Sequence, residues 1–119
     1  MTVAQQVAHV AQTLDWIGEG MFEDRWDMDF EKAIGVTNAV TSLTAARKEL
    51  DAAWERMSAR VEASSDAELT QPMADNPILG TRARYNGIEA MIDHTGHHRG
   101  ALTVYARLAG RVPEMPYGD

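Results

Sequence analysis

Three of the four histidines in this sequence lie within five positions, in the segment DHTGHHRG at residues 93–100. His94 and His98 are four residues apart, and a helix turns by about 100° per residue, so a helix places both on one face. The same face carries Met91 and Leu102, and imidazoles buried among apolar side chains are costly to leave unpaired. A divalent metal removes that cost, because it binds neutral imidazole nitrogens at about 2.0–2.1 Å. The spacing alone also fits the more common alternative, a structural or exposed pair.

A third metal ligand has to come from another element. His9 is the only histidine outside the segment, and it lies on the Gln6–Thr13–Trp16 flank of an N-terminal helical stripe. That position suits a residue facing a cleft between helices, although an ordinary boundary histidine would also occupy it. His9, His94 and His98 are therefore candidate metal ligands, for which the structural or boundary alternative stays open at this point, and His97 is expected to be a solvated residue or one that supports a ligand.

Two charged neighbours of these histidines have possible roles. Arg99 follows His98 directly, and it is predicted either to hold an anionic group of a substrate or to be a surface arginine. Asp93 could orient a ligand histidine by hydrogen bonding, but the helical wheel places it on the opposite face. Other metal motifs fail, because Thr95 stands where a zincin needs glutamate and no carboxylate lies three residues before any histidine.

Helical periodicity and capping signals predict the elements that position these residues. Thr2 and Gln5 form a capping box for a helix over about 3–22. A short helix is expected around 30–36, and a long one from a Thr41 cap to about residue 63. Ser65 and Glu68 cap a single turn.

The second half of the chain is expected to hold one more long helix. Residues 70–80 contain two prolines and a glycine and are predicted to form a loop. A helix over about 82–109, capped by Thr81 and stopped by Gly110, follows. The chain is thus predicted to be one all-α domain over 1–119, an up-down bundle of three long helices and a short one.

Composition excludes several classes of protein. The formal net charge is −7, and residues 15–31 carry seven acids against one arginine, which argues against nucleic-acid binding. There is no cysteine, so thiolate zinc sites and cysteine nucleophiles are absent. No segment is typical of a signal peptide or a membrane span, and the expected location is cytoplasmic.

The segments QQVAHVAQTLDWI, IDHTGHHRGALTVYARLAG and VPEMPYGD resemble the DinB/YfiT-like family of metal-binding helical bundles. The resemblance covers essentially the whole chain. It implies a four-helix bundle in which His9, His94 and His98 hold a divalent metal. Family members usually have a further helix before the one with the first histidine, whereas Met1 immediately precedes that helix here. The apolar groove that this leaves exposed could be covered by residues 30–40 folding back or by a second copy of the chain. We expect a two-fold homodimer with a largely hydrophobic interface that involves the helix over 3–22, with Trp16 and Phe22 as aromatic anchors.

The resemblance implies a broad range of activities. The leading hypothesis is an open three-histidine site for zinc, nickel or iron that supports thiol-dependent transfer or isomerisation of a small molecule. Its sulfur must come from a low-molecular-weight thiol, since the chain has no cysteine. The alternatives are a metal-dependent hydrolase of a small substrate and a non-enzymatic binding or structural protein stabilised by its metal. No nucleic-acid or membrane partner is expected.

Overall fold

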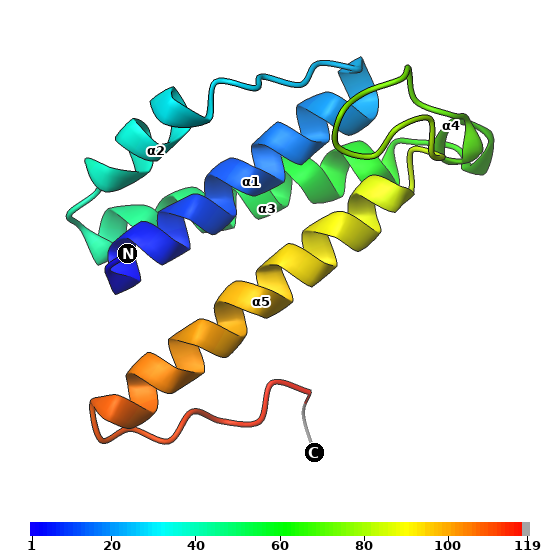
Figure 1. Ribbon diagram of the computed structural model, residues 1–119. Helices are drawn as coiled ribbons and strands as arrows, with labels where there is room; N and C mark the ends of the chain where they lie inside the picture. Colours follow the sequence, from blue (N-terminus) through cyan, green and yellow to red (C-terminus); the bar gives the residue numbers. More distant parts are fainter. Residues whose placement is uncertain (118–119) are drawn as a thin grey trace.

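The computed structural model describes residues 1–117, and the long elements of this part of the chain are all helices (Figure 1). The helices are α1 (Val3–Glu23), α2 (Phe30–Asn38), α3 (Leu43–Glu62), α4 (Asp66–Thr70) and α5 (Asn86–Leu108). The predicted all-α class is confirmed. The single turn predicted after Ser65 is the short helix α4, so two short helices accompany the three long ones.

Helix α1 is the centre of the fold. Helix α3 runs parallel to it, while α2 returns along one side and α5 runs antiparallel (Figure 1). Helix α1 packs closely against α2, α3 and α5, whereas the backbones of α3 and α5 do not come as close to each other within residues 1–117. The two outer long helices therefore depend on α1 for their relative position.

The sequence of α1 explains this central position, because apolar or small residues occur on more than one of its faces. Its buried residues include Val7, Val10, Leu14, Ile17 and Met21. They form the core with residues such as Ala53 and Met57 of α3 and Met91 of α5. Helix α5 comes close to α1 at Gly87, where an added Cβ would lie 2.8 Å from Met21 Sδ.

Burial of α1 bears on the predicted dimer. Val7, Val10 and Leu14 are buried within the chain, and the indole of Trp16 donates to the Asp27 carbonyl. Helix α1 therefore does not have the free apolar stripe that the predicted interface requires. The predicted interface requires that α1 lack a neighbour, whereas α3 and α5 cover it from two sides.

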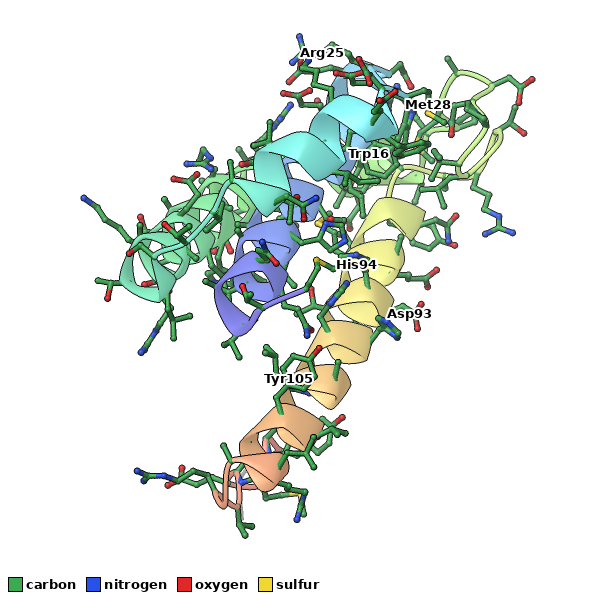
Figure 2. The ribbon with its side chains drawn as sticks, turned by 60° about the vertical axis from the view of Figure 1, so that its left-hand side comes forward. Trp16, Arg25, Met28, Asp93, His94 and Tyr105 are labelled. Atoms are coloured by element: carbon green, nitrogen blue, oxygen red, sulfur yellow. The ribbon has the colours of Figure 1, made fainter. Side chains whose placement is uncertain are left out.

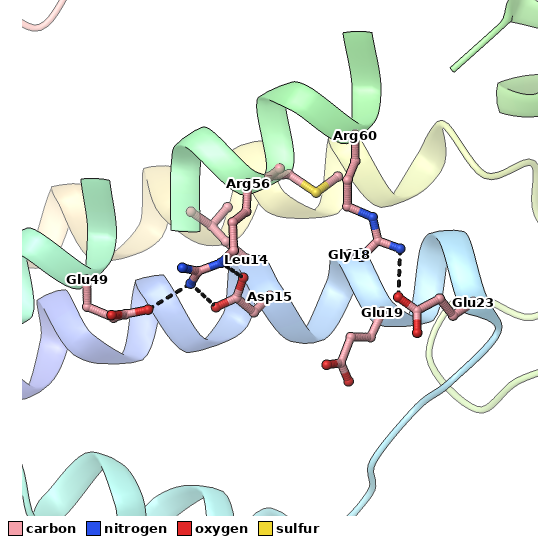
Figure 3. Close-up of a pocket in the computed structure, with 9 residues that line it drawn as sticks. Leu14, Asp15, Gly18, Glu19, Glu23, Glu49, Arg56 and Arg60 are labelled. Atoms are coloured by element: carbon pink, nitrogen blue, oxygen red, sulfur yellow. Dashed lines mark hydrogen bonds and ion pairs between the residues drawn. The ribbon is translucent and has the colours of Figure 1, made fainter. Parts of the chain in front are cut away.

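A charged cluster fixes α1 against α3 on the surface of the fold (Figure 3). Arg56 donates two hydrogen bonds to Asp15, at 3.1 and 2.6 Å, and a third to Glu49 at 2.7 Å. One turn further on, Arg60 pairs with Glu23 at 2.7 Å. These partly exposed pairs are compatible with the register that the buried core gives the two parallel helices, and each adds little stability.

Most of the predicted helix ends are confirmed, and two caps are corrected. Thr2 and Ser65 form the predicted capping boxes, and Gly110 has a φ of 75° just after the last helix. Helix α3 is capped by Ser42 rather than Thr41, because the Ser42 hydroxyl accepts from Ala45 N. Thr81 does not cap α5 either, since that helix begins only at Asn86.

The late start of α5 has a tertiary cause. Residues 71–73 and 82–84 pair through the backbone, with Met73 N donating to Arg82 O and Arg84 N to Gln71 O. Tyr85 N in turn donates to Leu69 O. The Arg82 carbonyl, which would accept from residue 86 in a helix starting at 82, accepts from Met73 instead, and Ala83 lies in an antiparallel bridge with Pro72. Within residues 1–117, no helix is long and apolar enough to cross a membrane.

Candidate metal centre

Helices α1 and α5 bring three histidines together. His9 comes from α1, and His94 and His98 come from α5, where their spacing of four puts both on the face that packs against α1. His9 Nε2 and His94 Nε2 are 3.1 Å apart. The ring centroids are separated by 4.6–4.9 Å, and one nitrogen from each ring lies within 4.8 Å of the others. The predicted ligands therefore form one compact cluster.

Burial keeps these imidazoles neutral. The pKa of His94 falls from 6.5 to about 4, first because burial disfavours the charged ring and then because His98 and His9 lie beside it. Burial also lowers the pKa of His9 and of His98. Neutral imidazole is the form that binds a metal. Without a metal, one of His9 and His94 can donate its Nε2 hydrogen to the other.

Gln6 orients one of the three rings. Its side chain is only 4% exposed, and its Oε1 lies 3.4 Å from His98 Nδ1. A His98 tautomer with hydrogen on Nδ1 donates to this oxygen, which leaves the lone pair of Nε2 free for a metal. The sequence analysis placed Gln6 on the same flank as His9 but did not assign it this role. The sequence feature that could have indicated this role is the position of Gln6, a polar residue three positions before the candidate ligand His9.

The donor set of the cluster fits a divalent metal. Three neutral nitrogens converge from two helices, and no cysteine or carboxylate joins the group anywhere in residues 1–117. Structural zinc sites normally have four protein ligands, whereas catalytic sites combine three with an exchangeable position. A metal held by these three histidines would therefore keep an exchangeable coordination position, which is what we call an open site.

The other charged residues near the histidines lie outside the cluster. Asp93 is exposed and points away from α1, whereas His94 points toward it (Figure 2). His97 is also exposed, with its ring centroid 5.0 Å from that of His98. Arg99 donates to the Tyr117 hydroxyl at 2.6 Å and lines a groove between α3 and α5. An anion-binding role for Arg99 stays a prediction, and it would place the anion in that groove.

A cavity of about 310 Å³ adjoins the cluster, and His9 and His94 form part of its lining. The rest comes from α1, the following loop and α2, with Trp16, Phe30 and Val36 among the apolar residues. Trp16 stacks edge to face on Trp26 and on Phe30, with centroids 5.1 and 6.0 Å apart. The histidines are therefore accessible to a small molecule from this side.

Comparison with known proteins yields one match. The family model described as the DinB superfamily matches residues 1–102, which include all three clustered histidines. No curated protein and no solved structure was found to match the chain.

Proposed function

The chain belongs to the DinB superfamily, and from its histidine cluster we propose that it is a metal-dependent enzyme acting on a small molecule. One observation carries this proposal: three neutral imidazoles converge beside a cavity, with no fourth protein ligand among residues 1–117. His9, His94 and His98 would hold the metal, and Gln6 would orient His98. Imidazole suits zinc, nickel and iron alike, and the proposal covers all three.

A divalent metal with three neutral ligands keeps most of its charge, so it would acidify a bound water or thiol. The chain's own residues contribute binding and exclusion of water. Trp16 and Phe30 form an apolar wall beside two of the ligands, and Gln6 keeps one imidazole in the binding tautomer.

Thiol-dependent transfer or isomerisation is the reaction we favour. Because the chain has no cysteine, the sulfur would be supplied by a low-molecular-weight thiol. Metal-dependent hydrolysis is the alternative reaction, and it would proceed without any thiol. A purely structural metal is the third possibility, and the open type of the cluster argues against it.

Cobalt substitution separates these possibilities. The Co²⁺-loaded protein is titrated with a small thiol, and the near-ultraviolet absorption is followed for a thiolate-to-cobalt band. A saturable band that is absent in His94→Ala supports an open site that binds thiols. A spectrum that changes with neither thiol nor imidazole would indicate a closed structural site and would contradict the proposal. Turnover of activated esters without thiol, and no thiol band, would favour the hydrolase.

A further inference from the structure

The cavity beside His9 and His94 has a lining whose chemistry restricts its ligand. Most polar groups in or beside this lining form hydrogen bonds with one another. Trp16 Nε1 donates to Asp27 O at 2.8 Å, and Lys32 Nζ lies 3.3 Å from Asp27 Oδ2. The Thr37 hydroxyl donates to Gln12 Oε1 at 2.6 Å. A ligand therefore meets mainly the apolar surfaces of Trp16, Phe30 and α2.

The charges at this cavity disfavour an anion. Asp27 and Asp29 contribute two carboxylates to the lining against the single ammonium of Lys32. The Asp27 carboxylate accepts from Asp29 N and from Lys32, and these hydrogen bonds lower its pKa. Lys32 is thus already paired, and the cavity has a net negative rim.

The size of the cavity fits a ring. An apolar protein cavity of about 150 Å³ binds benzene, and the volume here is about 310 Å³. We propose, resting on the metal-dependent function above, that this cavity binds the uncharged apolar body of the substrate, of the size of one or two rings. Trp16 and Phe30 determine this specificity, and in the metal-free protein the acidic rim weakens the binding of anionic analogues.

Metal-free protein tests this inference, so the result does not depend on whether the proposed function holds. The Trp16 indole N–H resonance is followed by NMR during titration with benzyl alcohol and with benzoate. Benzyl alcohol should shift it saturably, and benzoate should bind about fivefold or more weakly because it faces a like charge. Phe30→Ala should weaken benzyl alcohol binding, whereas the control Ile34→Ala should not, since Ile34 is exposed and does not line the cavity.

Three outcomes would overturn the inference: no binding of benzyl alcohol, equal binding of benzoate, or binding indifferent to Phe30→Ala. The proposed function fails separately, through a lack of bound metal. A protein that binds metal but not the uncharged ring retains the first proposal and loses this one.

A second inference follows from the surface area of the chain. It exposes 7927 Å², whereas a folded monomer of its mass, 13.1 kDa, is expected to expose about 6,400 Å². Its radius of gyration is 15.5 Å, against about 13.5 Å for a compact domain of this length. The excess of about 1,500 Å² is larger than the roughly 800 Å² that each partner buries in a standard interface.

Part of the exposed apolar surface borders one groove. The groove lies between α3 and α5, has a volume of about 470 Å³, and includes Leu14 of α1 in its lining. Trp54 from α3 and Ile92 from α5 are 63% and 69% exposed. Two large apolar side chains this exposed beside one groove are typical of an interaction surface.

We infer that a second copy of the chain covers this groove, in a two-fold dimer that packs α3 and α5 of each copy against the other. The excess area is large enough to supply one such interface, and the groove carries both Glu62 and Arg99. Opposite charges on one self-complementary surface can pair across a two-fold axis. The cavity with His9 and His94 has a different lining and stays open.

Light scattering coupled to size exclusion tests the dimer at micromolar concentration. The expected mass is about 26 kDa, twice that of one chain. Trp54→Glu with Ile92→Glu should give a folded monomer, and Ile34→Glu, at a position 59% exposed on α2, should remain dimeric. A wild-type monomer would contradict the inference and leave the C-terminal segment, whose Tyr117 lines the groove, as its cover. A dimer that persists in the double variant would also contradict it.

Discussion

Acid should destabilise the metal-free protein through its histidine cluster. The pKa of His94 is lowered from 6.5 to about 4 by burial and by the neighbouring histidines. Above pH 6.5 the ring is neutral in the folded and unfolded states, so no cost arises. As the pH falls from 6.5 to about 4, the unfolded chain binds a proton that the folded chain does not, and the free energy of unfolding decreases.

The size of this effect follows from the two pKa values. A change from 6.5 to about 4 corresponds to at most about 3.4 kcal/mol, at 1.36 kcal/mol for each pKa unit. Because His94 is only partly buried, solvent screening reduces the expected loss to about 1–2 kcal/mol. Lowered pKa values of His9 and His98 act in the same direction.

Urea unfolding in the presence of a chelator measures this loss at about pH 7.5 and about pH 4.5, on either side of the unfolded-state pKa. His94→Gln removes the titrating group and should reduce the loss. His97→Gln changes the same residue type on the exposed side of α5 and serves as the control, with a loss closer to that of the wild type. Equal losses in the wild type and His94→Gln would refute the reasoning, because the cluster would then not cause the acid sensitivity.

Two further substitutions test how the site and the fold are held. Gln6→Leu removes the acceptor for His98 Nδ1 and should weaken metal binding by about 10–100-fold, measured by competition with a chromophoric chelator; unchanged affinity would show that Gln6 does not orient the ring. Arg84→Ala breaks a pair with Asp24 in which the arginine side chain is 17% exposed. It should cost about 2–3 kcal/mol in chemical denaturation, against about 0–1 kcal/mol for the more exposed Arg56→Ala; equal costs would contradict this ranking.

The helices and the shared face of two histidines could be predicted from the sequence because they depend on local patterns. The periodicity of α1 and its Thr2 capping box involve residues within a few positions of each other, so they can be read without knowing the tertiary structure. The same holds for the common face of His94 and His98. Joining His9 to them also required the family resemblance, because its position alone favoured an ordinary boundary histidine.

Features that depend on tertiary contacts could not be predicted in this way. Helix α5 begins late because residues 82–85 pair with residues 69–73. The role of Gln6 depends on a contact across 92 positions. The exposed apolar side chains beside the groove, Trp54 and Ile92, lie on α3 and α5 rather than on α1. The sequence could not indicate this, because no single helical stripe shows which of three amphipathic helices packs between the other two. The apolar wall formed by Trp16 and Phe30 likewise depends on tertiary structure, because the loop after α1 determines where α2 lies beside it.

Metal content of matched histidine variants tests the central claim most directly. Purified chains are saturated with a divalent metal, dialysed and analysed for metal per chain. The account predicts about one equivalent for the wild type and for His97→Ala, whose side chain lies outside the cluster. His94→Ala and His98→Ala should retain none, and His9→Ala should bind much more weakly. A wild-type chain without metal would contradict the account, and so would loss in His97→Ala together with retention in His9→Ala.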